Sequence, residues 1–525
     1  METSYGFNWW WPSLISLFFF FPFILLKFIS KRNYSNHPPE PLTLPIIGNL
    51  LFLRKTFFQL EPILRNLHAK YGPVISLRVG SRRTVIIADR VLAHQALIHN
   101  GAAFADRPPA LPTSRIFNNN QLNISSAKYG PTWRLLRRNI TSEILHASRV
   151  KSYSRARKWV LDILIKRLQS DDDQGVGQIG AAVRVIDHFQ YAMFCLLVLM
   201  CFGDKLEESK IKEIKTMQRR MMRAFSGFNL LNICPTLTKI LFRKRWHKLF
   251  QLRQQQHSVL IPLINSRKKV NEEAKAKASS AHDDNDSVLC YVDTLLGLEL
   301  PEKKRKLETE EMVSLCSEFL NAGTDTTSTA LQWIMANVVK HQEIQEKLYE
   351  EIKGVVLVRT GEVEIEEEDL HNMPYLRAVI LEGLRRHPPA HFVLPHVVSE
   401  DVVVGGHVVP KNGSVNFMVA EMGWDPNVWE DPMEFKPERF LVGGDNDKKV
   451  EFDIKGNREI KMMPFGAGRR ICPASGLAML HLEYFVANLV WKFEWKKVDE
   501  VDLSEAQEFT IVMKNPLRAR LIPRH

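Results

Sequence analysis

Cysteine is scarce in this chain. Only six of its 525 residues are cysteine, and no two of them have the spacing of paired metal ligands. This scarcity excludes a disulfide framework and a zinc site built from cysteine pairs. It favours reduced thiols facing a cytosol, mostly buried as small apolar groups. The cysteines stand at positions 195, 201, 234, 290, 316 and 472.

Internal repeats, basic tracts and nucleotide-binding fingerprints are also missing. The chain has 71 Lys and Arg against 59 Asp and Glu, a net charge of +12, but its basic residues are scattered singly. Scattered charges argue against a nucleic-acid partner, and they suit an acidic protein or an anionic membrane surface. Because no glycine-rich dinucleotide fingerprint is present, the chain is not expected to bind a nicotinamide or flavin dinucleotide itself.

One long hydrophobic run lies at the amino terminus. Phe7 to Ile29 is 23 residues long, enough to cross a hydrocarbon core of about 30 Å. Three tryptophans near its start suit a membrane interface, and Lys31 and Arg32 follow it, which predicts a cytosolic body. A cleaved signal peptide, the alternative, would have basic residues before the run and small residues after it. We therefore predict a single-pass membrane anchor over residues 1–30.

A proline-rich stretch separates the hydrophobic run from the rest of the chain. Prolines at 38, 39 and 41 resist both helix and central strand, so residues 31–50 are predicted to form a stiff linker. No clean break follows it, and residues 51–525 are expected to form one folded domain.

The domain is predicted to be mainly α-helical with a minor β portion. Helical periodicity extends from Glu311 to Lys340 and from Glu343 to Gly354. Short β-rich stretches occur between Val74 and Ala88 and from Val402 to Val409, the latter with a glycine pair as its turn. Ser266 to Ser287 is charged and poor in aromatics, which predicts a solvated loop.

Cys472 lies in a glycine-rich loop that runs into an apolar segment. Pro473 suits a helix start, because the backbone donor that proline lacks would be unpaired there. Backbone N–H groups at a helix start favour an anion, so they are expected to lower the thiol pKa. These features predict a stabilised thiolate beside arginines, which leaves a catalytic and a structural cysteine both open.

The loop also resembles the signature of the cytochrome P-450 superfamily. Its pattern Phe-x-x-Gly-x-Arg-x-Cys is matched by Phe465, Gly468, Arg470 and Cys472. The resemblance implies a haem-thiolate fold in which Cys472 is the axial ligand of haem b iron and Arg470 pairs with a haem propionate. The chain departs from the family at Ala474, where glycine is usual, and this puts the local packing in doubt.

A second mark lies inside the predicted helix from Glu311, where Ala322 to Thr327 reads Ala-Gly-Thr-Asp-Thr-Thr. Glycine and three threonines are poor helix formers. The Thr326 hydroxyl can bond the Ala322 carbonyl four residues back and open a local bulge. The alternative to a functional site is a polar, destabilised turn of the helix. The resemblance implies instead that this region holds O2 and that Asp325 and Thr326 relay protons.

Further residues match the family in order and spacing. Glu382 and Arg385 are one helical turn apart, and Arg439 follows in Pro-Glu-Arg-Phe. By spacing alone Glu382 and Arg385 would form a solvated surface pair. The resemblance implies that the three form a buried network supporting the haem loop.

Three more residues are expected near the propionates by resemblance. Trp133 and Arg137 match a Trp-x-x-x-Arg pattern on a predicted helix, although an amphipathic helix with a basic face is the plainer interpretation. His396, after Pro395, stands where the family often has a propionate-binding Arg or His, although a lone histidine is more often a satisfied core or surface group.

The resemblance implies a microsomal plant monooxygenase of specialised metabolism. It would insert one atom of O2 into a lipophilic small molecule. Its electrons would come from an NADPH-dependent diflavin reductase docked on a basic face near Cys472, at the endoplasmic reticulum membrane. The alternatives are a haem-thiolate isomerase or dehydratase without a reductase, and a non-catalytic haem-binding membrane protein. Expected pocket segments are Arg115–Asn123, Ala224–Leu231, Val393 and Phe509–Val512.

Overall fold

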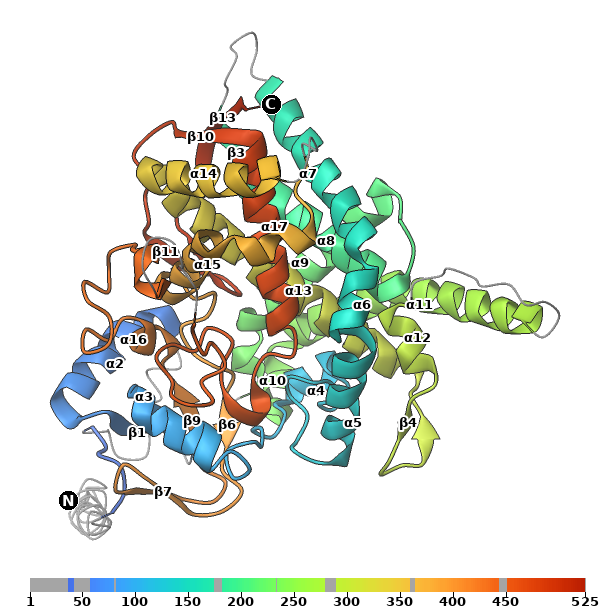
Figure 1. The fold of residues 1–525 in the computed structure, drawn as a ribbon. Helices are drawn as coiled ribbons and strands as arrows, with labels where there is room; N and C mark the ends of the chain where they lie inside the picture. Colours follow the sequence, from blue (N-terminus) through green and yellow to red (C-terminus); the bar gives the residue numbers. More distant parts are fainter. Residues whose placement is uncertain are drawn as a thin grey trace, which may run out of the picture.

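The computed structural model describes residues 36–41, 57–79, 82–173, 182–232, 234–278, 289–358, 364–442 and 451–524. Helices dominate these residues, as the hydrophobic periodicity predicts (Figure 1). The helices are α2 (Phe57–Tyr71), α3 (Arg90–His94), α4 (Pro112–Phe117), α5 (Pro131–Asn139), α6 (Ala147–Ser152), α7 (Ser154–Asp173), α8 (Val185–Phe202), α9 (Glu208–Gly227), α10 (Pro235–Leu241), α11 (Arg243–Ala278), α12 (Tyr291–Leu296), α13 (Thr309–Lys340), α14 (Gln342–Val358), α15 (Pro374–Arg386), α16 (Val419–Gly423) and α17 (Ser475–Lys492).

The strands form small sheets. The largest has the order β1-β2-β9-β6, in which β2 and β9 are parallel and the other pairs antiparallel. It lies beside α2 and α3 at one end of the molecule, while the long helices fill the rest (Figure 1). The strands are β1 (Val74–Val79), β2 (Arg82–Ile87), β3 (Val183–Arg184), β4 (Glu299–Leu300), β5 (Arg305–Lys306), β6 (His396–Val397), β7 (Val402–Val404), β8 (His407–Val409), β9 (Ser414–Phe417), β10 (Phe493–Lys497), β11 (Glu505–Gln507), β12 (Ile511–Met513) and β13 (Arg518–Pro523).

The core is built around α13. Helix α8 packs against it, and every residue of α8 except Asp187 is buried, as expected for a helix that is apolar on all sides. Among the described residues, α8 is also the one helix long and apolar enough to cross a membrane, but 94% of it is buried inside the protein. It is therefore a core helix, and the predicted anchor over residues 1–30 lies outside the described residues.

Close helix packing at α13 depends on glycine. A Cβ atom at Gly383 of α15 would lie 2.4 Å from a side-chain carbon of Ile334, which is closer than two carbon atoms can approach. The same holds at Gly323, where a Cβ would lie 2.8 Å from Leu197 of α8. Glycine at these positions lets α8 and α15 come close to the helix that carries the candidate proton relay.

One expected loop is in part a helix. Ser266 to Ser287 was predicted to be solvated, but α11 continues to Ala278 and only the residues after it lie outside the described part. The reason is a buried ion pair: Arg267 binds Asp293 through two hydrogen bonds of 2.7 and 2.8 Å, and Asn271 adds a third of 2.6 Å. These partners are remote in sequence, so local composition does not reveal them.

The predicted linker is partly in contact with the domain. The Pro39 carbonyl accepts a hydrogen bond from the Ser76 backbone of β1 at 2.8 Å, and the Asn36 carbonyl accepts one from Val408 of β8 at 2.6 Å. These contacts tie residues 36–41 to two of the small sheets, so this stretch has a defined position on the domain.

Candidate active site

Cys472 lies two residues before Ala474, the N-cap of α17. Its backbone N–H donates to the Phe465 carbonyl at 2.8 Å, which closes the loop. Gly468 has a φ of +70°, and a Cβ atom there would lie 2.1 Å from the Leu97 carbonyl oxygen. No other residue type can take that conformation so near a neighbouring backbone. The glycine of the signature is therefore required by the packing of this loop.

The pKa of the Cys472 thiol is raised, whereas the position of the thiol before a helix start predicts that it is lowered. Burial raises the pKa of Cys472, while the Ala474 N–H and the charge of Arg137 lower it by less. The helix start alone therefore does not hold a thiolate here, and a stronger positive partner is needed. A metal ion is such a partner, since a coordinating thiol is deprotonated outright. The described part of the chain holds no group of three or more His, Cys, Asp or Glu side chains that could bind a metal. Haem, which carries its own nitrogen ligands, needs only the Cys472 thiolate from such a site.

Arg470 lies beside this loop and is held by the backbone. Its guanidinium donates to the carbonyls of Ala105, Ile124 and Ala127 at 2.7, 3.2 and 2.6 Å. It stacks over the ring of Trp133 at 4.4 Å. Burial lowers the pKa of Arg470 to about 10, so the group still carries its charge at neutral pH.

Arg107 is a site residue that the sequence did not suggest. It is 7% exposed and donates to the carbonyls of Ser125, Leu394 and Pro395 at 2.8, 2.8 and 2.9 Å. Burial lowers its pKa to about 9, and the nearby charge of Arg470 acts in the same direction. The sequence signal at Arg107 is weak, because an arginine before two prolines has many ordinary explanations.

The two arginines share an unmet requirement for an anion. Within the described residues neither forms an ion pair, and each spends three of its five N–H donors on carbonyl oxygens. Asp106 is a nearby counter-charge for both, but one carboxylate does not balance two guanidinium groups, of which Arg107 is buried and Arg470 half-buried. A ligand with two carboxylates would satisfy both, and haem carries two propionates. The donor set therefore fits the cofactor that the signature implies.

Trp133 and Arg137, which are also predicted to lie near the propionates, donate hydrogen bonds to backbone carbonyls. Trp133 gives its one N–H to the Ile124 carbonyl at 3.1 Å, so it supports Arg470 and has no donor left for a carboxylate. Arg137 donates to the Ile471 carbonyl at 2.6 Å, directly beside Cys472, and it keeps further donors.

His396 is the remaining predicted propionate partner. It is buried, and burial lowers its pKa to about 3, so the ring is neutral. Its Nδ1 lies 2.6 Å from the Phe104 carbonyl and must carry the ring proton, because a carbonyl only accepts. The remaining nitrogen is then an acceptor, which argues against the predicted bond to a propionate. Arg107 donates to the carbonyl of the preceding residue, Pro395, at 2.9 Å, so a guanidinium group lies close to this position.

The polar turn of α13 has the predicted hydroxyl bond. Thr326 Oγ1 donates to the Ala322 carbonyl at 2.6 Å. The predicted bulge is not present, because α13 remains α-helical throughout. Burial raises the pKa of Asp325, partly offset by Arg219 and Lys215, so this carboxyl group holds its proton to higher pH than an exposed one.

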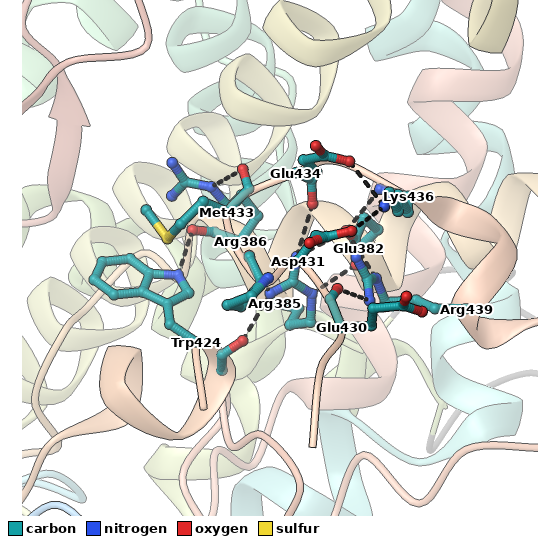
Figure 2. A network of polar contacts seen from close by, with 12 residues as sticks. Glu382, Arg385, Arg386, Trp424, Glu430, Asp431, Met433, Glu434, Lys436 and Arg439 are labelled. Atoms are coloured by element: carbon teal, nitrogen blue, oxygen red, sulfur yellow. Dashed lines mark hydrogen bonds and ion pairs between the residues drawn. The ribbon is translucent and has the colours of Figure 1, made fainter. Parts of the chain in front are cut away.

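Glu382, Arg385 and Arg439 lie in contact (Figure 2). Arg385 forms a two-pronged ion pair with Glu382 at 2.7 and 2.8 Å, and both side chains are fully buried. Arg439 reaches the same carboxylate at 3.2 Å. The pair is thus not the solvated contact that its spacing alone would suggest. The guanidinium of Arg385 also binds the carbonyls of Gly423, Pro432 and Glu434.

The network is connected to the segment before the cysteine loop. The Arg385 guanidinium lies over the ring of Trp429 at 5.4 Å. Trp429 in turn donates to the Lys461 carbonyl at 3.3 Å, three residues before Pro464. A disturbance at Glu382 is therefore expected to reach the loop that holds Cys472.

Comparison with known proteins extends the resemblance from the loop around Cys472 to nearly the whole chain. Residues 38–523 match the cytochrome P450 family. The chain is 51% identical to Cytochrome P450 89A9 of Arabidopsis thaliana, over 95% of this chain and 96% of that protein. It is 31% identical to an isoflavone 3'-hydroxylase of Medicago truncatula, over 97% of this chain and 96% of that protein.

A solved structure of a zebrafish cytochrome P450 with progesterone shares the fold, with a TM-score of 0.69 at 22% identity over 88% of this chain and 99% of that one. The likeness is thus not confined to the loop around Cys472, since both curated relatives are covered almost from end to end. The chain therefore belongs to the cytochrome P450 family and is a monooxygenase with a haem-thiolate cofactor.

Proposed function

We propose that haem b binds through Cys472, with Arg107, Arg137 and Arg470 facing its propionates. The observation that carries this proposal is the close pair of guanidinium groups beside the Cys472 loop, Arg107 buried and Arg470 half-buried, neither of which forms an ion pair within the described residues. When bound, the haem activates O2 and inserts one oxygen atom into the substrate. The protein holds the cofactor, orients the substrate and supplies protons.

Proton supply is assigned to α13. The raised pKa of Asp325 keeps a larger share of the carboxyl group protonated, so it can act as an acid. Thr326 uses its own proton on the Ala322 carbonyl, which leaves its oxygen lone pairs to hold a water or pass a proton. This pair favours a monooxygenase over an isomerase or dehydratase, which needs no proton delivery to oxygen.

Lipophilic specialised metabolites are the proposed substrates, and three of the four expected pocket segments bear on this: Arg115–Asn123, Ala224–Leu231 and Phe509–Val512. The first two are joined at Phe117 of α4 and Phe228 after α9, whose rings lie 6.0 Å apart. The third is held against α13, where Thr510 bonds Thr329 at 2.9 Å and the Ile511 carbonyl accepts a bond from Trp333 at 2.9 Å. Phe509, in the turn between β11 and β12, remains half exposed.

Removal of the Thr326 hydroxyl tests this function. In Thr326→Ala we expect normal haem content but about tenfold less product per NADPH, with more hydrogen peroxide, because general acid help is worth 10²–10⁴-fold and waters or Thr327 soften its loss. The assay substrate is first found by spin-state titration against fractionated plant metabolites. Thr324→Ala is the control, since Thr324 makes the same kind of bond, to Leu320 at 2.7 Å, but is buried. An unchanged ratio in Thr326→Ala would remove Thr326 from the mechanism and favour the isomerase.

Electrons are proposed to come from an NADPH-dependent diflavin reductase docked over α5. Lys128, Arg134, Arg138 and Arg469 are exposed there, and no carboxylate forms an ion pair with them among the described residues. On the same helix Arg137 touches the residue next to Cys472. This basic face thus lies close to the cofactor site and suits an acidic partner.

We also propose that the domain, residues 51–525, sits on the endoplasmic reticulum membrane through the anchor and a second, shallow contact at α10. Leu237, Ile240 and Leu241 of α10 are 52%, 68% and 63% exposed, and Arg243 and Lys244 follow them. An apolar face flanked by basic residues is suited to a membrane interface.

Deletion of residues 1–30 is therefore expected to release the protein only partly from membranes, with haem content unchanged. Adding Leu237→Ser, Ile240→Ser and Leu241→Ser should complete the release in a sedimentation assay. Leu357→Ser is the matched control, because Leu357 is 67% exposed on α14. Complete release by the deletion alone would refute the contact at α10.

A further inference from the structure

Glu318 of α13 is a carboxylate that binds a loop by its backbone. Its Oε2 accepts the Ile124 N–H at 2.8 Å, and its Oε1 accepts the Ser125 N–H at 2.7 Å. The Ser125 hydroxyl also contacts Oε1. Within the described residues no Lys, Arg or His forms an ion pair with Glu318. Burial raises its pKa, and these hydrogen bonds act against that shift.

The bond to Ser125 determines which way the neighbouring carbonyl points. The Ile124 C=O and the Ser125 N–H belong to one peptide group, and in a trans peptide they point in opposite directions. The described residues contain no cis peptide. When the N–H faces Glu318, the Ile124 carbonyl must therefore face away from α13, where it accepts bonds from Trp133 at 3.1 Å and Arg470 at 3.2 Å.

The same short loop holds Arg107, which is buried, and Arg470, which is half-buried. The Ser125 carbonyl accepts from Arg107 at 2.8 Å, and the Ala127 carbonyl accepts from Arg470 at 2.6 Å. One side of the loop is thus bound to a carboxylate of α13, and the other presents carbonyls to two guanidinium groups that form no ion pair within the described residues.

We propose that Glu318 is a positioning residue for the cofactor: it orients the loop from Ile124 to Ala127 so that Arg107 and Arg470 face the haem propionates. This inference rests on the proposed role of Arg470. Helix α13 then has two roles. It carries Asp325 and Thr326, and two turns earlier its Glu318 orients the loop that binds the two arginines.

A double-mutant cycle on the haem-loaded full chain tests this coupling. The readout is the rate at which ferric haem leaves the protein for excess apomyoglobin, in wild type, Glu318→Gln, Arg470→Lys and the double variant. Glutamine keeps the shape of the side chain but puts an NH2 group against one of the two N–H donors. Each single change is expected to speed haem loss about tenfold, and the double change at most about twofold more, because residues in one network are not additive.

Two controls separate this role from general stability. Ser125→Ala keeps both backbone bonds to Glu318 and removes only the hydroxyl contact to Oε1, which also accepts the Ser125 N–H. It is expected to change haem loss by less than about twofold. Glu310→Gln, on the exposed side of the same helix, should have no effect. If Glu318→Gln takes up no haem, Glu318→Asp replaces it in the cycle, because it keeps the charge but is one carbon too short to reach both donors.

The outcomes are distinguishable. Strict additivity of Glu318→Gln and Arg470→Lys would overturn the inference and leave the role of Arg470 intact. Unchanged haem loss in Glu318→Gln would overturn it too. Unchanged haem loss in Arg470→Lys would refute the proposed propionate contact itself, and with it the route through which Glu318 is said to act.

Discussion

Cys472→Ser is expected to abolish the strongly red-shifted Soret band of the reduced, CO-bound protein. That band reports a thiolate on the iron, and a neutral hydroxyl is a much poorer ligand that donates little electron density. The measurement is a CO difference spectrum on purified protein together with its haem content. Because a serine hydroxyl is a weaker iron ligand than a thiolate, we also expect the serine variant to hold haem less well.

Cys234→Ser is the appropriate control for this prediction. Cys234 is an exposed thiol, and its replacement should leave the band and the haem content unchanged. Persistence of the band in Cys472→Ser would show that another group ligates the iron, and the assignment of the site would then be wrong.

The second large effect is expected at Glu382. Glu382→Ala removes the counter-charge of Arg385, which is 1% exposed, and of Arg439. Breaking a buried ion pair on one side costs about 3–5 kcal/mol, a large part of the stability of a typical domain. We therefore expect mainly insoluble or haem-free protein, measured as soluble yield and haem per chain.

Glu438→Ala provides the contrast within the same short segment. Glu438 forms an exposed ion pair with Lys347 at 2.8 Å, and such pairs contribute only about 0–1 kcal/mol. This variant should bind haem normally. If Glu382→Ala also kept full haem content, the network in Figure 2 would not support the cofactor loop.

Features that depend on near neighbours in the chain were predictable. The bond from Thr326 to the Ala322 carbonyl follows from helical spacing, because residues four apart lie one above the other. The periodicity that predicts a helix from Glu311 to Lys340 matches α13, which begins only two residues earlier. The β-rich stretch from Val402 to Val409 forms the hairpin of β7 and β8, with Gly405 and Gly406 at positive φ in its turn.

Charges that meet across the fold were not predictable in the same way. Arg107 and Glu318 carry no motif, and their partners lie near Ser125 and Pro395 on other elements. The position of His396 suggested a propionate donor, but its bond to Phe104 leaves the free nitrogen an acceptor. Such outcomes depend on which carbonyl a side chain meets and on how deeply it is buried.

The sequence by itself therefore determined the helical class, the loop around Cys472 and the order of the other family motifs along the chain, because each depends on residues within a few turns of one another. Only the tertiary structure decided that Glu382 and Arg385 are buried and not solvated, that residues 266–278 continue a helix, and that the thiol pKa is raised. The physical reason is that burial and long-range hydrogen bonds set the cost of a charge, and both arise when distant segments pack together.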